Sequence, residues 1–507
     1  MFLKSTHQYD KMNYVQEKRD YMAKSSGVIR KITSWKIVLL IQLIASIVFL
    51  GIVYRLGILP IRYFLIVVGV AILLWFISFV LTRPGKKKKK KIFGKFVSVL
   101  LSILLLFVSL RIAQGDSLLA SFTSIGQEVT RISLVVMKDS PYESIDGLDY
   151  CTVETSLSLD KANMEEGIKV LEKANPLLDI EKITNIGQLA DDLYNGDADA
   201  VFVNEAYYAM FENKHENFRY DTRVIWTHEI IEEVSDFSKS VKVLKEPFTV
   251  YISGIDTDGD VSTVSRSDVN MIVTVNPKTH QVLMTSIPRD YFVTLADVGM
   301  KDKLTHSGLT GTDNTVQTVE DFMDIDINYY VRVNYTSLIK LVDAIGGVTI
   351  DVPFSFYSGV DSSYFEKGRQ LMDGETAMKY VRERKAFPDG DNDRIHNQQI
   401  VLTAIIEKLI SPKIITNYTK ILDAVEGSFE TNMSTRDITS LIQMQIDKKP
   451  AWTIIQKQLS GTPERSTEGY YMYGTSIYYT MPDEDSIEEN KEYIQQILDG
   501  EILEVND

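Results

Sequence analysis

Three long apolar runs near the start of the chain form the strongest pattern in the sequence. They cover residues 35–54, 58–81 and 96–112, and the third reaches the length of the other two when Ile92 and Phe93 are included. A helix needs about 20 apolar residues to cross the hydrocarbon core of a bilayer. One such run could be a buried core helix, but three in succession favour a membrane anchor. We therefore predict three transmembrane helices within residues 35–112.

Basic residues on either side of these runs predict how the anchor is oriented. Residues 1–34 form a polar, basic tail, and six consecutive lysines at 86–91 separate the second and third runs. Cytoplasmic loops carry the excess of Lys and Arg, so we expect the tail and the lysine loop in the cytoplasm. The part after residue 112 is then extracellular. The lysines could also contact anionic lipid head groups.

Charge divides the chain sharply at the end of the anchor. Residues 1–112 carry 19 basic and 3 acidic side chains, whereas residues 113–507 carry 35 basic and 66 acidic ones. An acidic bulk argues against nucleic acid as a partner of the large C-terminal part. The single cysteine, Cys151, excludes an intrachain disulfide framework and a site built from several cysteines.

Residues 113–245 are expected to form a smaller accessory domain that begins with a linker or stalk at 113–130. Strand-like segments alternate with helix-like ones, which is typical of an α/β domain. The predicted strands are 131–137, 150–154 and 198–203, and the predicted helices are 161–174, 185–194 and 204–211. No cluster of chemically active residues stands out, so we expect a spacer or docking domain.

Residues 246–507 are expected to form one larger α/β sandwich. Strands are predicted at 248–253, 269–276, 281–287, 329–334 and 348–352, and helices around 316–323, 335–345 and 394–409. The turn-rich segment 276–280 joins two of these strands as an antiparallel hairpin, so the sheet should be mixed.

Two aspartates are predicted to meet at one edge of this sheet. Asp256 follows a strand, and Asp268 precedes the next one. Two carboxylates at one sheet edge can hold Mg²⁺, which keeps several waters and completes its shell with phosphate oxygens. The acidic run 256–260 also resembles part of a calcium loop, but it lacks the glutamate that an EF-hand requires.

Arginines concentrate around residues 382–398. Arg382 and Arg384 end one predicted helix, and the next helix carries Arg394 and Gln398 one turn apart, with Asp391 or Asn392 as its N-cap. These could be surface arginines balanced by nearby acids. Further cationic candidates are Arg266, Arg289, which ends a strand, and Lys303 on a loop. Five arginines and a lysine in an acidic domain favour a ligand with more than one phosphate.

The chemistry that these residues suggest is metal- and arginine-assisted phosphoryl transfer or diphosphate cleavage. The sequence contains no Walker A loop, no Gly-x-Ser-x-Gly elbow and no His/Cys metal motif, so a covalent protein nucleophile is not expected. Guanidiniums and a metal ion can stabilise the charge that develops on the transferred phosphoryl group. Asp290 could act as a general base or only orient Arg289.

Several segments of residues 246–400 together resemble the LytR-CpsA-Psr (LCP) family of Gram-positive bacteria, with the streptococcal capsule CpsA type as the nearest likeness. They are GID at 254–256, RSD at 266–268, NPKTHQVLMTSIPRD at 276–290, LVDAIGGVTIDVP at 341–353, and GRQLMDGETAMKYVRER with DRIHNQQ at 368–399. The three-span anchor and the accessory domain also resemble this type. Asn397 stands where many relatives carry another arginine.

The resemblance implies a fold, an activity and a set of site residues. The fold is a mixed-sheet α/β/α sandwich, and the activity is transfer of a glycopolymer, such as capsular polysaccharide, from a polyprenyl (pyro)phosphate carrier to peptidoglycan. Asp256 and Asp268 would hold Mg²⁺, with Mn²⁺ as a substitute. An apolar tunnel would hold the lipid tail. The diphosphate would contact Arg266, Arg289, Lys303, Arg382, Arg384, Arg394 and Gln398, and the catalytic set would be Arg289, Asp268, Arg382 and Arg384.

Two other functions fit the same sequence. The chain could be a membrane-bound regulator or scaffold of capsule synthesis that senses lipid-linked glycan, with its basic tail contacting capsule synthesis proteins. It could also be a phosphohydrolase of polyprenyl diphosphates, for which hydrolysis would use the same cluster of charged residues.

Overall fold

The computed structural model describes residues 34–57, 59–85, 88–122, 126–234, 236–255, 257, 260–359, 361–388, 390–411, 421, 424–425 and 427–504. Most of the predicted cytoplasmic tail, two of the six lysines and Asp256 therefore lie outside the described residues. The chain divides into two compact units. One runs to Ser117 and includes residues 442–448, and the other comprises residues 118–441 and 449–507.

Three helices of the first unit coincide with the predicted spans. They are α2 (Trp35–Leu56), α3 (Ile61–Thr82) and α4 (Lys88–Phe122), and each is long and apolar enough to cross a membrane. The Ser34 side chain accepts a hydrogen bond from the Ile37 N–H at the start of α2, and Gly57, with φ of 67°, ends that helix. The expected linker at 113–130 is helical as far as Phe122, because its alanines and leucines extend the helix without a proline to stop it.

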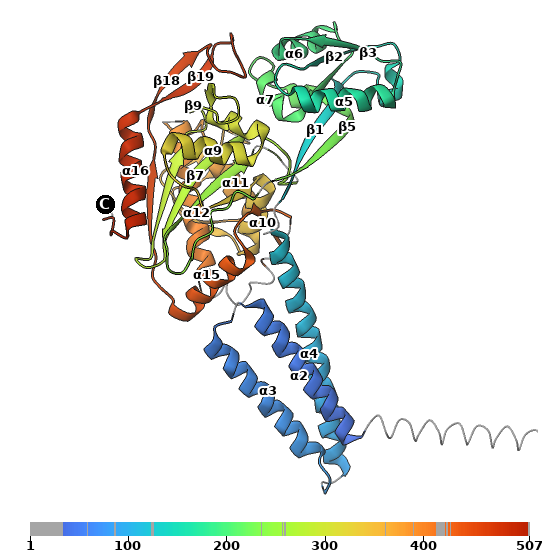
Figure 1. Ribbon diagram of the computed structural model, residues 1–507, viewed down its shortest axis with the longest axis vertical. Helices are drawn as coiled ribbons and strands as arrows, with labels where there is room; N and C mark the ends of the chain where they lie inside the picture. The colour runs from blue at the N-terminus through green and yellow to red at the C-terminus, as the bar shows by residue number, and fades with distance from the viewer. Residues whose placement is uncertain are drawn as a thin grey trace, which may run out of the picture. The chain divides into compact units, whose positions relative to one another are not determined.

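A five-stranded mixed sheet forms the core of the accessory domain. Its strands, in the order β3-β2-β4-β1-β5, are β3 (Asp179–Ile183), β2 (Thr152–Ser156), β4 (Ala200–Asn204), β1 (Gln127–Met137) and β5 (Thr222–Glu233). The covering helices and turns are η1 (Ile145–Leu148), α5 (Lys161–Ala174), α6 (Ile186–Asn195), η2 (Glu205–Tyr207), α7 (Tyr208–Phe211) and α8 (Phe218–Asp221). The long strands β1 and β5 pair antiparallel over their whole length, as Figure 1 shows.

Strands β3 and β5 were not expected from the sequence. β3 is an edge strand in which every residue is exposed or partly exposed, so it lacks the apolar alternation that marks a half-buried strand. β5 is the other edge strand and has only two buried residues, Thr222 and Ile230. Both segments are strands because a neighbouring strand offers backbone hydrogen bonds, a reason that a local pattern does not reveal.

A six-stranded mixed sheet forms the centre of the larger domain. Its strands, in the order β16-β11-β6-β7-β8-β17, are β16 (Glu430–Thr431), β11 (Tyr329–Val333), β6 (Phe248–Ile255), β7 (Ser267–Asn276), β8 (Gln281–Ile287) and β17 (Thr453–Gln458). β7 and β8 form the predicted antiparallel hairpin, whereas β11 runs parallel to β6 and β17 parallel to β8. The prediction of a mixed sheet is confirmed.

Helices cover both faces of this sheet, because neighbouring residues of a strand point to opposite sides. Ile272 packs in one buried cluster with Val319 of α9 (Thr312–Met323) and Ile494 of α16 (Glu484–Asp499). Met271 and Val273 lie in another cluster, with Leu402 of α12 (Asp391–Leu409). The three layers confirm the predicted α/β/α sandwich.

The remaining elements of the larger domain surround the sheet. They are β9 (Phe292–Thr294), β10 (Lys301–Lys303), η3 (Leu304–Thr310), α10 (Tyr335–Ala344), β12 (Val348–Val352), β13 (Phe356–Tyr357), β14 (Tyr364–Phe365), β15 (Gly368–Met372), α11 (Gly374–Arg382), α15 (Thr435–Lys448), β18 (Gly461–Ser466) and β19 (Ile477–Pro482). α12 begins at Asp391 with Gly390 as its N-cap, so the predicted caps Asp391 and Asn392 were wrong by one or two positions. Gly390 has a positive φ of 56°, which suits glycine at that turn.

Candidate active site

Asp268 and Arg289 form an ion pair at one end of the β7–β8 hairpin. The register pairs Asn270 with Ile287, the last residue of β8, and continuing it by two residues brings Asp268 opposite Arg289. The Nη1 atom of Arg289 donates to Oδ2 of Asp268 over 2.6 Å. The Thr305 hydroxyl donates to the other oxygen, Oδ1, over 2.8 Å. Both carboxylate oxygens are therefore held in place.

The electrostatics of Asp268 show that three arginines converge on it. Burial by itself would raise the pKa of this carboxyl, but the positive charges of Arg289, Arg266 and Arg394 outweigh burial and hold the pKa well below its usual range. These arginines come from the hairpin, from the segment before β7 and from the first turn of α12. Because all three arginines act on Asp268, these three segments, which are distant in sequence, meet at a single site.

Gly308 lets η3 approach the segment that carries Arg266. A Cβ at position 308 would lie 2.5 Å from the carbonyl oxygen of Ser265 and 2.8 Å from the amide nitrogen of Ser267. Such contacts are too short for any side chain, so only glycine allows η3 to pack here. The backbone on both sides of Arg266 is thereby fixed against η3.

The end of α11 is shaped by a buried acid, Glu383. Its side chain is fully buried and accepts hydrogen bonds from the backbone N–H groups of Gly359, Arg384 and Ala386. Burial would raise the pKa of Glu383, but these N–H groups hold it below its usual range. The turn places Arg382 and Arg384 on either side of this anchor. The guanidinium of Arg382 lies over the Tyr335 ring, 4.6 Å from its centroid.

These residues line one cavity of about 560 Å³. Its charged and polar lining includes Arg266, Asp268, Arg289, Arg382, Glu383, Arg384, Lys385, Arg394, Gln398 and Glu212. Its apolar lining includes Ile252, Ile255, Val269, Met271, Val333, Leu338, Met378, Val381, Val401, Leu402 and Ile405, contributed by β6, β7, β11 and helices α10, α11 and α12. One cavity thus combines a cationic wall with an apolar one, which suits a ligand with an anionic group and a hydrocarbon part.

Most of the residues predicted for the site meet in this cavity. Five arginines, Asp268 and Gln398 line it. Asp256 lies outside the described residues, although β6 ends at Ile255, which also lines the cavity. Lys303 is not among the lining residues, because its Nζ lies 2.7 Å from Oδ1 of Asp290. The binding roles of these residues stay predictions.

Asp290 has the environment of a positioning residue. Its Oδ2 lies 3.6 Å from Nε of Arg289, and its other oxygen accepts from Lys303. Burial would raise its pKa, but the charges of Arg289 and Lys303 hold the pKa below its usual range, which makes Asp290 a weak base. The carboxylate also lies outside the cavity lining.

Among the lining residues that were not predicted from the sequence, Tyr335, Lys385 and Glu212 bear directly on the site. Tyr335 follows a strand and starts a helix, a position that gave no sign of its contact with Arg382. Lys385 directly follows Arg384 and could have been included by proximity. Glu212 belongs to the accessory domain, at the end of α7, and no local pattern connects it with the arginines. Asn397, where many relatives carry arginine, is buried and is not part of the lining.

Asp268 is the predicted metal ligand that the structure describes. Within the part of the chain that the structure describes, no group of three or more His, Cys, Asp or Glu side chains could hold a metal ion. Asp268 nevertheless presents a carboxylate to the cavity, and each oxygen keeps a lone pair beyond the bond it accepts. Mg²⁺ needs few protein ligands when phosphate oxygens and waters complete its shell, so a substrate-dependent Mg²⁺ site at Asp268 stays a prediction.

The fold and the cavity define a class of protein: an α/β protein with three membrane-capable helices and a cationic, partly apolar cavity. The LytR_cpsA_psr family description matches residues 212–495, more than half of the chain. The chain therefore belongs to the LytR_cpsA_psr family, as the motifs predicted. The matched range begins at Glu212, at the end of α7.

Named relatives indicate the kind of enzyme. The chain is 34% identical over 276 residues to the Bacillus subtilis (strain 168) polyisoprenyl-teichoic acid–peptidoglycan teichoic acid transferase TagU, covering 54% of this chain and 85% of the relative. The Enterococcus faecalis (strain ATCC 700802 / V583) protein of the same name is 36% identical over 222 residues, covering 43% and 71%. The crystal structure of B. subtilis TagV aligns with a TM-score of 0.43. The alignment covers 50% of this chain and 98% of the TagV chain, with 32% sequence identity. The prediction of a transferase is confirmed.

Proposed function

We propose that this chain transfers a glycopolymer from a polyprenyl diphosphate carrier to a hydroxyl group of peptidoglycan. The observation that carries the proposal is the cavity that joins five arginines to an apolar wall. Named relatives act on polyisoprenyl-linked teichoic acid and peptidoglycan, which supports the same classes of donor and acceptor here. For the donor polymer we propose capsular polysaccharide.

The arginines would bind the diphosphate, while the apolar wall would hold the first part of the lipid tail. The acceptor hydroxyl attacks the glycan-side phosphorus and forms a phosphodiester. The bridging P–O bond breaks, polyprenyl phosphate leaves, and the hydroxyl proton passes to water. Negative charge builds up on the phosphoryl and leaving oxygens, and Arg289, Arg382 and Arg384, which line the cavity, would stabilise it. No covalent intermediate with the protein is required.

Asp268 has two parts in this proposal. Its ion pair with Arg289 fixes the direction in which that guanidinium points. With Asp256 it would also hold Mg²⁺, which supplies positive charge to the diphosphate oxygens when bound. Lys303 would act on Arg289 indirectly, through Asp290.

The proposed orientation places the cavity outside the cell. The six lysines at 86–91 and the basic tail support a cytoplasmic N-terminus by the positive-inside rule. An odd number of spans then puts the large C-terminal part on the outer side, where peptidoglycan lies. A reporter enzyme that is active only outside the cell should be active when fused to the C-terminus. A reporter that is active only in the cytoplasm should be inactive there.

The test is a transfer assay with the full-length chain in detergent micelles. A polyprenyl diphosphate donor carrying labelled capsular polysaccharide, or teichoic acid in a second arm, is incubated with Mg²⁺ and peptidoglycan. We expect labelled peptidoglycan from the wild-type chain and from the control Arg369→Ala, an exposed arginine outside the cavity. Release of labelled polymer without attachment to peptidoglycan would instead show a phosphohydrolase. If the wild-type chain neither attaches nor releases polymer, the sensing role is favoured.

A further inference from the structure

Glu212 is a cavity residue that belongs to the accessory domain rather than to the catalytic sandwich. It follows α7, and its side chain is 29% exposed. The carboxylate is oriented by Arg219, whose Nε lies 3.3 Å from Oε1 of Glu212. Arg219 in turn lies over the Tyr208 ring, 5.9 Å from its centroid. The lining of the cavity that is proposed to bind the diphosphate thus includes a carboxylate from a second domain.

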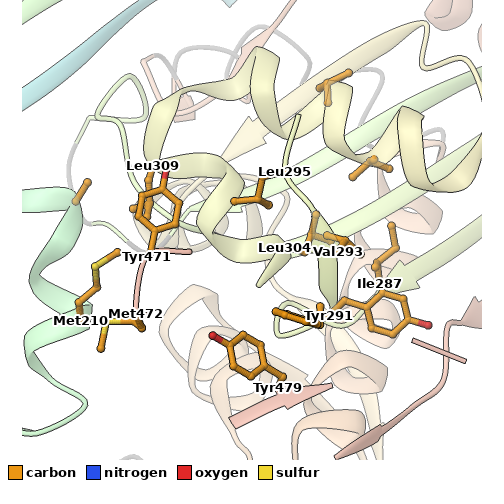
Figure 2. Close-up of a cluster of buried hydrophobic side chains, with 14 of the residues drawn as sticks. Met210, Ile287, Tyr291, Val293, Leu295, Leu304, Leu309, Tyr471, Met472 and Tyr479 are labelled. Carbon is orange, nitrogen blue, oxygen red and sulfur yellow. The ribbon is translucent and has the colours of Figure 1, made fainter. Parts of the chain in front are cut away.

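Buried side chains of η2 and α7 pack against the larger domain. Tyr207 and Met210 are 2% and 3% exposed, and they belong to the same buried cluster as Tyr471 and Met472. The rings of Tyr207 and Tyr471 are 6.3 Å apart, and Figure 2 shows Met210 beside Met472. Glu212 lies two residues after Met210, so this packing determines where its carboxylate is held.

A second attachment holds the accessory domain where β1 begins. Arg332 of β11 is 1% exposed, and its Nη1 donates to Oε1 of Glu128 on β1 over 2.9 Å. Glu128 also accepts from the backbone N–H of Thr312 over 2.8 Å. Val333, the next residue of β11, lines the cavity. Two attachments, one charged and one apolar, therefore orient the accessory domain toward the site.

The chemistry of a carboxylate limits what Glu212 can bind. An anionic side chain repels a diphosphate, so it is not a phosphate ligand. Carboxylate oxygens are instead strong acceptors for hydroxyl groups. We propose that the accessory domain completes the substrate site and that Glu212 binds hydroxyl groups of a saccharide next to the diphosphate. This rests on the proposed function, and the saccharide belongs either to the donor glycan or to the acceptor.

A binding experiment on the full-length chain in micelles separates these sources. Three ligands are compared: bare polyprenyl diphosphate, the same lipid carrying a saccharide, and a soluble peptidoglycan fragment. In Glu212→Ala we expect bare diphosphate to bind as tightly as in the wild type or more tightly. Binding of one saccharide ligand should weaken by about tenfold, the loss of one hydrogen bond to a charged group. The ligand that weakens identifies the donor or the acceptor.

The matched control is Glu216→Ala, an exposed glutamate in the same loop that does not line the cavity. It should bind all three ligands as the wild type does. Glu212→Gln, which keeps one acceptor oxygen, should fall between wild type and Glu212→Ala. Unchanged binding of all three ligands by Glu212→Ala, or equal loss of all three, overturns the inference. If Glu212→Ala weakens saccharide binding but the wild-type chain transfers no polymer, the proposed function is contradicted and the inference about Glu212 is not.

Discussion

Asp268 and Arg289 face each other across the β7–β8 hairpin, with 2.6 Å between Oδ2 and Nη1. Their side chains are only 12% and 18% exposed, so the pair is largely removed from water. The register of the hairpin decides that these two residues meet. The pair connects the predicted metal ligand to the predicted phosphate ligand, and several predictions depend on it.

Removing the guanidinium of Arg289 should abolish most activity. Arg289→Ala takes away a proposed phosphate ligand and leaves Asp268 without the guanidinium that pairs with it. We expect transfer to fall by about 10²- to 10³-fold, the usual effect of removing one charge-stabilising donor. The measurement is the rate of glycopolymer transfer at saturating donor. Arg289→Lys keeps the charge but not the planar fork and should lose less activity. Full activity in Arg289→Ala would refute the assignment.

Acid should destabilise the protein partly through Asp268. Its pKa is lowered by folding, so the carboxylate stabilises the fold above the ordinary value of about 3.9, and this contribution is lost as the pH falls toward the folded pKa. We expect Asp268→Asn to have a lower Tm than wild type at pH 7, and the difference should shrink below about pH 4. Thermal unfolding at a series of pH values measures this. A difference that does not change with pH would contradict the prediction.

Chelation should stop turnover reversibly. If Asp268 contributes to a Mg²⁺ site that phosphate oxygens complete, EDTA will abolish transfer, and added Mg²⁺ or Mn²⁺ will restore it. Asp268→Asn should raise the Mg²⁺ concentration needed for half-maximal activity. The readout is the transfer rate as a function of free Mg²⁺. Wild-type activity that survives chelation would exclude the metal.

Tyr335 should strengthen diphosphate binding through Arg382. The ring lies 4.6 Å from the guanidinium and fixes its position over the cavity. A cation–π contact contributes about 0.5–2 kcal/mol, so Tyr335→Leu should weaken binding by roughly 2- to 30-fold. The dissociation constant for bare polyprenyl diphosphate measures the effect. Tyr335→Phe keeps the ring and serves as the control, so equal losses in both variants would point to the hydroxyl instead.

Breaking the ion pair between Arg332 and Glu128 should loosen the attachment of the accessory domain. Arg332→Ala leaves Glu128 buried without its charge partner, which typically costs about 3–5 kcal/mol. We expect a lower Tm and faster proteolysis between the accessory and catalytic domains. Changing both residues, Arg332→Met with Glu128→Gln, should recover part of the lost stability because position 128 then carries no charge. The recovery should be incomplete, because the buried Glu430, whose Oε2 lies 3.9 Å from Nη1 of Arg332, also loses its partner. An unchanged Tm in Arg332→Ala would contradict the role of the pair.

The sequence alone determined much of the architecture. The apolar runs predicted α2, α3 and α4 because a helix that crosses a membrane must be apolar on every side. The turn at 276–280 predicted the β7–β8 hairpin, and with it a mixed sheet. The family motifs also named the arginines that line the cavity. These features are local, so residues close together in the chain carry the whole signal.

Only the tertiary structure decided which charged side chains share the cavity. The sequence grouped Lys303 with the arginines, but in the folded chain its Nζ donates a hydrogen bond to Asp290. No local pattern pointed to Glu212, because its place depends on contacts of Tyr207 in η2 and Met210 in α7 with residues more than 250 positions later, such as Tyr471 and Met472. A sequence records which side chains carry charge and which are apolar. Their distances and burial, which set pKa values and partners, depend on contacts between distant segments that exist only in the folded chain.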